Sequence, residues 1–107
     1  MKKFLISLLL VCGTAQAQFQ SGNDLHKDIN DSSPQSNMYA LGYIVGVTDT
    51  FIGTTICIPQ GVSQGQLLDV VRNFLTRAPQ ARNLPANVLV MVAVEEHWPC
   101  PKGKKRS

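Results

Sequence analysis

The sequence predicts an all-α fold, a small helical bundle of about four helices stapled by one disulfide. Three observations favour this class. Between residues 22 and 98, apolar residues recur at helical spacing in segments separated by short connections that contain Pro, Gly or Ser. The one run that would suit a strand has no second strand to pair with. Cys57 and Cys100 are the cysteines that remain after removal of an expected leader, an even number that permits one bridge.

Residues 1–17 have the pattern of a secretory signal peptide. Two lysines precede the short apolar run Phe4–Val11, and the Ala-Gln-Ala sequence that ends at Ala17 suits signal peptidase. The run is too short for a stable membrane anchor. A lipoprotein signal could use Cys12, but Val11 stands where that signal needs a small residue. We therefore expect export to the periplasm without stable membrane insertion.

The mature chain is expected to form one helical domain, residues 18–100, followed by a basic disordered tail, residues 101–107. The domain carries four Lys/Arg against seven Asp/Glu, whereas the tail carries four positive charges. A mildly acidic domain without interleaved basic and aromatic residues does not indicate nucleic-acid binding. The alternative for the tail is weak attachment to an anionic surface such as a membrane or cell wall.

The first expected helix is short. Ser21 or Asn23 could cap it, and Leu25 and Ile29 are four residues apart and therefore share a face. A loop follows and ends at Pro34, which is tolerated in the first turn of a helix.

The longest expected helix spans residues 38–53. Its predicted core stripe consists of Met38, Leu41, Val45, Thr48 and Ile52, with Ile44, Val47 and Phe51 beside it. A second stripe holds Tyr39, Gly42, Gly46, Asp49 and Gly53. Each helical glycine costs about 1 kcal/mol, so we expect another backbone to approach this stripe closely. A membrane helix is the rival interpretation, and a charge at Asp49 disfavours it.

Two further helices are expected. Ser63 caps a helix over 64–77, with Leu67, Val70, Val71, Phe74 and Leu75 on its apolar face and Asp69, Arg72, Asn73 and Arg77 toward water. Ala78–Pro85 is a polar connection in which Asn83 could cap the next helix. The valine-rich segment 86–98 resembles a strand locally, but its length between Pro85 and Pro99 favours a helix.

The segment Glu95–Cys100 contains side chains that could bind a metal or act as a thiol catalyst. His97 and Cys100 form a close pair, but Cys57 and His26 are isolated, whereas zinc sites usually use two close pairs. Cys57 has no nearby base in sequence, and Cys100 lies between two prolines. We therefore predict no metal, no cofactor and no catalytic residue.

The acids of this segment also lack a catalytic arrangement. Glu95 and Glu96 point about 100° apart on a helix and do not converge on one atom. The remaining interpretation is a disulfide between Cys57 and Cys100 that ties the loop after the long helix to the end of the last one. Trp98 then packs beside the bridge. His97 and His26 are expected at the surface.

These segments resemble the Rap/Tai immunity proteins of type VI secretion. The resemblance covers nearly all of the mature chain and is carried by GNDL at 22–25, LGYIVGVTD at 41–49, CIPQGVSQGQL at 57–67, a VVRNFL helix and a terminal WPC. It implies a small, exported, helical protein that binds and inhibits a peptidoglycan amidase injected by a neighbouring cell. It also implies a structural packing role for Tyr43, Gly46 and Asp49, and pairing of the two cysteines.

One feature of the family is absent. A further cysteine pair, which joins the first two helices in the family, is replaced here by residues around Asp28–Ile29 and by Ala40. How firmly the first helix is held therefore depends on other contacts.

On this hypothesis, two exposed loops contact the toxin. The candidate residues in the loops Thr54–Gly61 and Ala78–Pro85 are Thr54, Thr55, Gln60, Gln80, Arg82 and Asn83. The alternative for each loop is a simple connection. The sequence is also compatible with a homodimer. The alternative function is a periplasmic acid-activated chaperone, because such proteins are also small, helical and singly disulfide-bonded. An enzyme is the least supported class.

Overall fold

Four α-helices form the part of the chain that the computed structural model describes, residues 19–101. They are α1 (Gly22–Asn30), α2 (Pro34–Phe51), α3 (Gln64–Arg77) and α4 (Ala86–His97), with a short 3₁₀ helix, η2 (Pro79–Ala81), before α4. The predicted all-α class is confirmed. The expected signal peptide and most of the basic tail lie outside the described residues. None of the helices described is long and apolar enough to cross a membrane.

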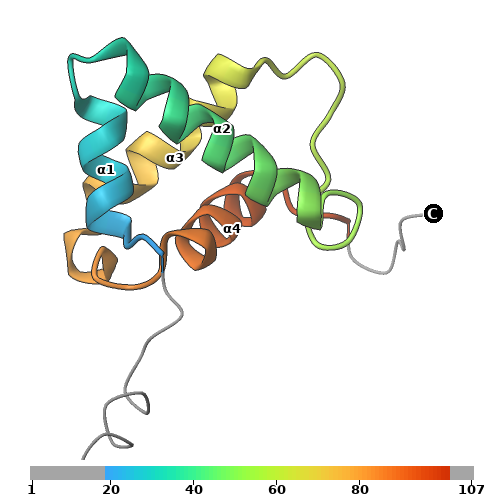
Figure 1. Cartoon of the computed structure of the whole chain (residues 1–107). Coiled ribbons are helices and arrows are strands. Elements are labelled where there is room, and N and C mark those ends of the chain that lie inside the picture. The colour runs from blue at the N-terminus through green and yellow to red at the C-terminus, as the bar shows by residue number, and fades with distance from the viewer. Residues whose placement is uncertain (1–18, 102–107) are drawn as a thin grey trace, which may run out of the picture.

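The four helices pack as one bundle in which each contacts the other three. In Figure 1, α2 runs across the front of α3 and beside α4, while α1 closes one side. One core unites all four helices and the loop after α2. Its members are Leu25, Ile29, Ala40, Ile44, Ile56, Leu67, Val71, Phe74, Leu75, Ala86, Leu89, Val90, Ala93 and Val94.

Serine caps begin three of the helices, as local sequence chemistry predicts. The side chains of Ser21, Ser33 and Ser63 accept hydrogen bonds from backbone N–H groups in the first turns of α1, α2 and α3. At Ser21 and Ser63 the cap is reciprocal, because the side chain three residues later accepts from the backbone of the serine. Pro34 occupies the first turn of α2, where its missing N–H has no cost.

The predicted core stripe of α2 was wrong in part. The buried residues of this helix are Ala40, Ile44 and Thr48, whereas Met38 is 68% exposed and Ile52, just beyond the helix, is 47% exposed. The true core face is therefore rotated away from the predicted stripe. The cause is that α2 is apolar on most of its circumference, so helical periodicity alone identifies its buried face poorly.

The expectation of a close backbone approach at the α2 glycines was also wrong. A Cβ atom added at Gly42 or Gly46 would meet nothing within 4 Å outside the local helix. These positions form an open ridge of α2 on the surface. The close approach occurs at Gly22 instead, where a Cβ would come within 2.9 Å of the carbonyl oxygen of Arg82.

The last segment is helical, as predicted, but Asn83 does not cap it. Pro85 occupies the N-cap position and provides no side-chain hydrogen bond. Instead, the backbone N–H of Ala86 donates to the carbonyl of Gln20, at 2.9 Å. The start of α4 is therefore stabilised by the segment before α1, a contact between residues distant in sequence.

Two sets of hydrogen bonds hold α1 in place, one at each of its ends. At its N-terminus, the N–H groups of Gly22 and Asn23 donate to the carbonyls of Leu84 and Arg82, at 2.9 and 2.7 Å. At its C-terminus, the side chain of Asn37 donates to the carbonyls of three residues, Asp28, Ile29 and Asp31. Ile29 and Ala40 are both buried in the core, where they add apolar contacts between α1 and α2 to these hydrogen bonds.

Candidate functional site

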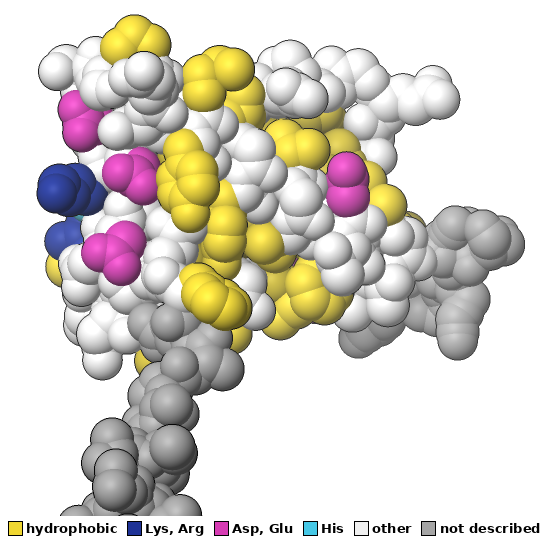
Figure 2. Space-filling view, viewed as in Figure 1, with side chains coloured by type: hydrophobic (Ala, Val, Ile, Leu, Met, Phe, Trp, Pro, Cys, Tyr) yellow, Lys and Arg dark blue, Asp and Glu magenta, His cyan; other side chains and the backbone are white. Residues whose placement is uncertain are grey.

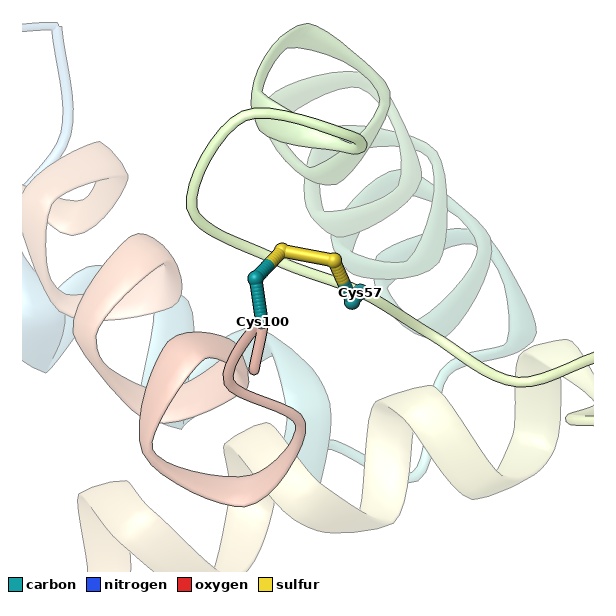
Figure 3. The surroundings of a disulfide bond; sticks show 2 residues. All are labelled: Cys57 and Cys100. Atoms are coloured by element: carbon teal, nitrogen blue, oxygen red, sulfur yellow. A yellow bond between two sulfur atoms is a disulfide. The ribbon is translucent and has the colours of Figure 1, made fainter. Parts of the chain in front are cut away.

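The predicted disulfide between Cys57 and Cys100 is present. It joins the loop after α2 to the segment after α4, across a sequence separation of 43 residues (Figure 3). The backbone supports the same junction, because the N–H of Cys57 donates to the carbonyl of Trp98 at 2.9 Å. Ile56 is fully buried, and its backbone forms isolated β-bridges with Ile52 and with Pro99. The disulfide and these backbone contacts therefore hold the same two segments together.

The other side chains of the Glu95–Cys100 segment have structural surroundings. Glu96 accepts a hydrogen bond from Arg77 at 2.9 Å, and both side chains are largely exposed. His97 is exposed and meets Trp98 edge to face, with ring centroids 4.6 Å apart. Trp98 packs against the core, as expected. Among residues 19–101, no group of three or more His, Cys, Asp or Glu side chains is placed to hold a metal ion.

His26 lies in a polar junction rather than freely at the surface. Its Nδ1 is 3.1 Å from Nη1 of Arg82, and its Nε2 is 3.3 Å from the hydroxyl of Thr76. Arg82 Nη1 also donates to the carbonyl of Leu75 at 3.1 Å. Partial burial lowers the pKa of His26, and the positive charge of Arg82 lowers it further. The neutral imidazole therefore fits this junction best.

The candidate loop residues differ in their surroundings. Thr54, Thr55 and Gln60 are exposed, and so are Gln80 and Asn83. Arg82 is part-buried and holds its loop to α1 and α3 through the contacts described above. Of the six residues, Arg82 therefore positions its loop, while the other five are accessible to a partner.

A surface hollow lies beside the first candidate loop. It has a volume of about 340 Å³ and is lined by apolar side chains and the backbone of the loop, at Ile52, Gly53, Ile56, Cys57 and Ile58. A second hollow of about 190 Å³ shares Ile52 and Ile58 and extends between α2 and the start of α3. The disulfide thus fixes the shape of an indented surface next to Thr54 and Thr55.

The three residues of the α2 motif have different environments. Tyr43 packs against the core, and burial raises the pKa of its hydroxyl, as does nearby Tyr39. A hydrogen bond from the Asn87 backbone partly offsets this rise in the pKa of Tyr43. Gly46 and Asp49 face solvent. Within the motif, packing into the core is therefore the role of Tyr43.

A surface that the sequence analysis did not assign to binding runs over α2 and α4. We call it the apolar band and define it by Tyr39, Gly42, Gly46, Leu84, Val88 and Val92. Tyr39 is 61% exposed, and the three aliphatic side chains are between 38% and 45% exposed. Figure 2 shows hydrophobic side chains gathered over these two helices. Two features of the sequence could have indicated this surface. One is the second stripe of α2, and the other is the valine-rich segment of α4, which has more apolar residues than one face of a helix can bury.

The described residues thus form a disulfide-linked helical scaffold with an indented surface beside one loop and an exposed apolar surface over two helices. The family model for Rap1a immunity proteins matches residues 21–100. The chain therefore belongs to the Rap1a immunity protein family, whose members bind a secreted toxin. No curated protein matches the chain.

Proposed function

We propose that this chain is a periplasmic immunity protein that binds a type VI secreted peptidoglycan amidase and blocks its active site. The family match over residues 21–100 is the observation that supports this proposal most directly. The motifs of the sequence agree with it, because they resemble immunity proteins directed against amidases. The signal-peptide pattern of residues 1–17 supports the same location.

The scaffold suits inhibition by occlusion. A disulfide and a shared core fix the relative positions of the two candidate loops, so little conformational entropy is lost when a partner binds. Thr54, Thr55 and Gln60 present polar groups beside an apolar hollow, a combination that fits a neighbouring protein surface. Gln80 and Asn83 present exposed polar groups on the loop that Arg82 holds in place.

Protection and inhibition test the proposal together. A panel of type VI amidases is directed to the periplasm of a sensitive host, with and without this chain. Each amidase is then purified and assayed on peptidoglycan with increasing amounts of the mature chain. We expect one amidase to lose toxicity in cells and activity in the assay at a stoichiometric ratio. Absence of protection, of inhibition and of a complex across the panel would contradict the proposal.

The loop residues are tested on the same amidase. A Thr54→Ala, Thr55→Ala and Gln60→Ala triple variant and a Gln80→Ala and Asn83→Ala double variant should inhibit less well. Asn73→Ala is a matched control, because Asn73 is an exposed residue of α3 outside both loops. Protection of aggregating client proteins at acidic pH, without amidase binding, would instead favour the acid-activated chaperone.

A further inference from the structure

We propose that the apolar band is the main docking surface for the toxin, and that the toxin meets it with apolar side chains bordered by Lys or Arg. This inference rests on the proposed function and adds the surface and the chemistry of the partner. The loops then form the margins of one interface, since Leu84 belongs to the second loop and α2 leads directly into the first.

The shape of the band suits contact with another protein. Gly42 and Gly46 lie one turn apart on the outer side of α2, and nothing lies within 4 Å of where their Cβ atoms would be. A partner can therefore approach the α2 backbone itself. Keeping two glycines in mid-helix lowers helix propensity, and no internal packing accounts for them. Close approach by a partner would account for both.

The two halves of the band are joined at Tyr43. Its side chain packs on the core from α2, and the backbone of Asn87, in the first turn of α4, lies near enough to its hydroxyl to lower the pKa of Tyr43. Tyr39 lies one turn before it, and Val88 follows Asn87 directly. The exposed apolar groups of α2 and α4 consequently form one surface. A surface of this kind, exposed and bordered by polar groups, commonly marks a protein interface.

Charge identifies the kind of partner. Residues 19–101 carry four Lys/Arg against seven Asp/Glu. Three of these four basic side chains already have partners within the chain. Arg72 pairs with Asp69, Arg77 pairs with Glu96, and Arg82 donates to the carbonyl of Leu75.

Carboxylates border the band. Asp49 lies on the same outer side of α2, and Glu95 lines a hollow of about 350 Å³ together with Val92 and with Glu96, the partner of Arg77. In Figure 2, acidic side chains lie on both sides of the hydrophobic ones, and the visible basic ones lie toward one edge. A positively charged border on the partner would complement this arrangement. A second copy of the chain would instead bring the same carboxylates to the interface, where like charges repel.

The test uses the amidase that the protection assay selects and the mature, oxidised chain. Binding is measured by isothermal titration calorimetry for wild type, Gly46→Gln, Tyr39→Lys and the control Gly65→Gln. Gly65 is also an exposed helical glycine, but on α3, and its nearest neighbour outside the local helix is the Ser63 hydroxyl, at 3.8 Å. Both positions are exposed, and a Cβ atom at either one meets nothing closer than 3.8 Å outside the local helix, so thermal unfolding should show no loss of stability in either variant.

We expect Gly46→Gln and Tyr39→Lys to weaken binding by about tenfold or more, as for residues at the centre of an interface. Gly65→Gln should bind as wild type does. Wild-type affinity should also fall as NaCl is raised from roughly 50 to 500 mM, because salt screens the charged border.

Three results would overturn the inference. The first is unchanged amidase binding by both band variants, which would leave the proposed function intact. The second is an affinity that does not respond to salt, which would exclude the basic border of the partner. The third is a wild-type dimer that Gly46→Gln converts to a monomer in analytical ultracentrifugation, because a second copy would then cover the band. Failure of every amidase to bind wild type would instead refute the proposed function itself.

Discussion

Gly22 is the residue at which the packing of α1 leaves no room for a side chain. A Cβ there would lie 2.3 Å from a methyl carbon of Leu89 and 2.9 Å from the carbonyl oxygen of Arg82. The leucine could move, but the Arg82 carbonyl is backbone held by a hydrogen bond from Asn23. Gly22→Ala should therefore destabilise the fold by about 1–3 kcal/mol.

Gly42→Ala is the matched control, since it adds the same atom in open space. It should stabilise the fold by about 0.5–1 kcal/mol, because alanine restricts the unfolded chain and favours the helix. Urea unfolding of both variants measures the difference. Equal effects of the two substitutions would contradict the packing described for Gly22.

His26 makes the stability of the domain depend on pH. Burial and Arg82 hold its pKa in the folded state below the ordinary value of 6.5, so the unfolded chain takes up a proton first as pH falls. The contribution of His26 to stability is therefore fully present above pH 6.5 and is lost as pH falls from 6.5 toward the folded pKa. Urea unfolding at a series of pH values should show this decrease. In His26→Gln the decrease should be smaller, and an unchanged profile would exclude His26 as its source.

At the scale of helices, one side chain joins α1 to α2. Asn37 donates from its amide to the carbonyls of Asp28 and Asp31 at 3.0 Å and of Ile29 at 3.3 Å. Asn37→Ala leaves these carbonyls without that partner, so we expect a loss of about 1–3 kcal/mol. Hydrogen exchange should then accelerate first in α1. Asn73→Ala, an exposed change on α3, should alter neither the stability nor the exchange.

How well each helix could be predicted depends on how local its determinants are. Caps such as Ser63 depend on residues three positions away, and the sequence analysis placed them correctly. The start of α4 depends on Gln20, more than sixty residues earlier, and Asn83 was wrongly chosen as its cap. Local reasoning has no access to such a partner.

The buried face of α2 shows a second limit. Apolar residues surround most of this helix, because it serves both the core and the exposed surface. Helical periodicity identifies a buried face only where polar residues mark the opposite face. Here they do not, and Met38 was wrongly predicted to lie in the core. For the candidate site, the disulfide followed from cysteine number and export. That Tyr39 and Val88 belong to one band follows only from the packing of α2 against α4, which brings together residues almost fifty positions apart.

For the molecule as a whole, the disulfide is the main covalent constraint on a small core. It closes a loop with a sequence separation of 43 residues, for which the chain-entropy model gives about 4 kcal/mol of stabilisation. Replacement of Cys57 and Cys100 by serine should therefore lower the free energy of unfolding by roughly 2–5 kcal/mol.

Chemical reduction of the wild-type chain provides the control for this prediction. Urea unfolding of the reduced wild type should match that of the double serine variant, because both lack the same bond. A double variant as stable as the oxidised wild type would show that the core alone sustains the fold.

The bridge between Cys57 and Cys100 also bears on when the protein becomes active. A reduced chain has only a small core to resist unfolding, so newly made copies should pass readily through a narrow translocation channel. On the proposed periplasmic function, oxidation after export would convert a chain that unfolds easily into a rigid inhibitor. We expect that a toxin stored in the cytoplasm of the same cell would escape capture there, since its antagonist matures only after leaving that compartment.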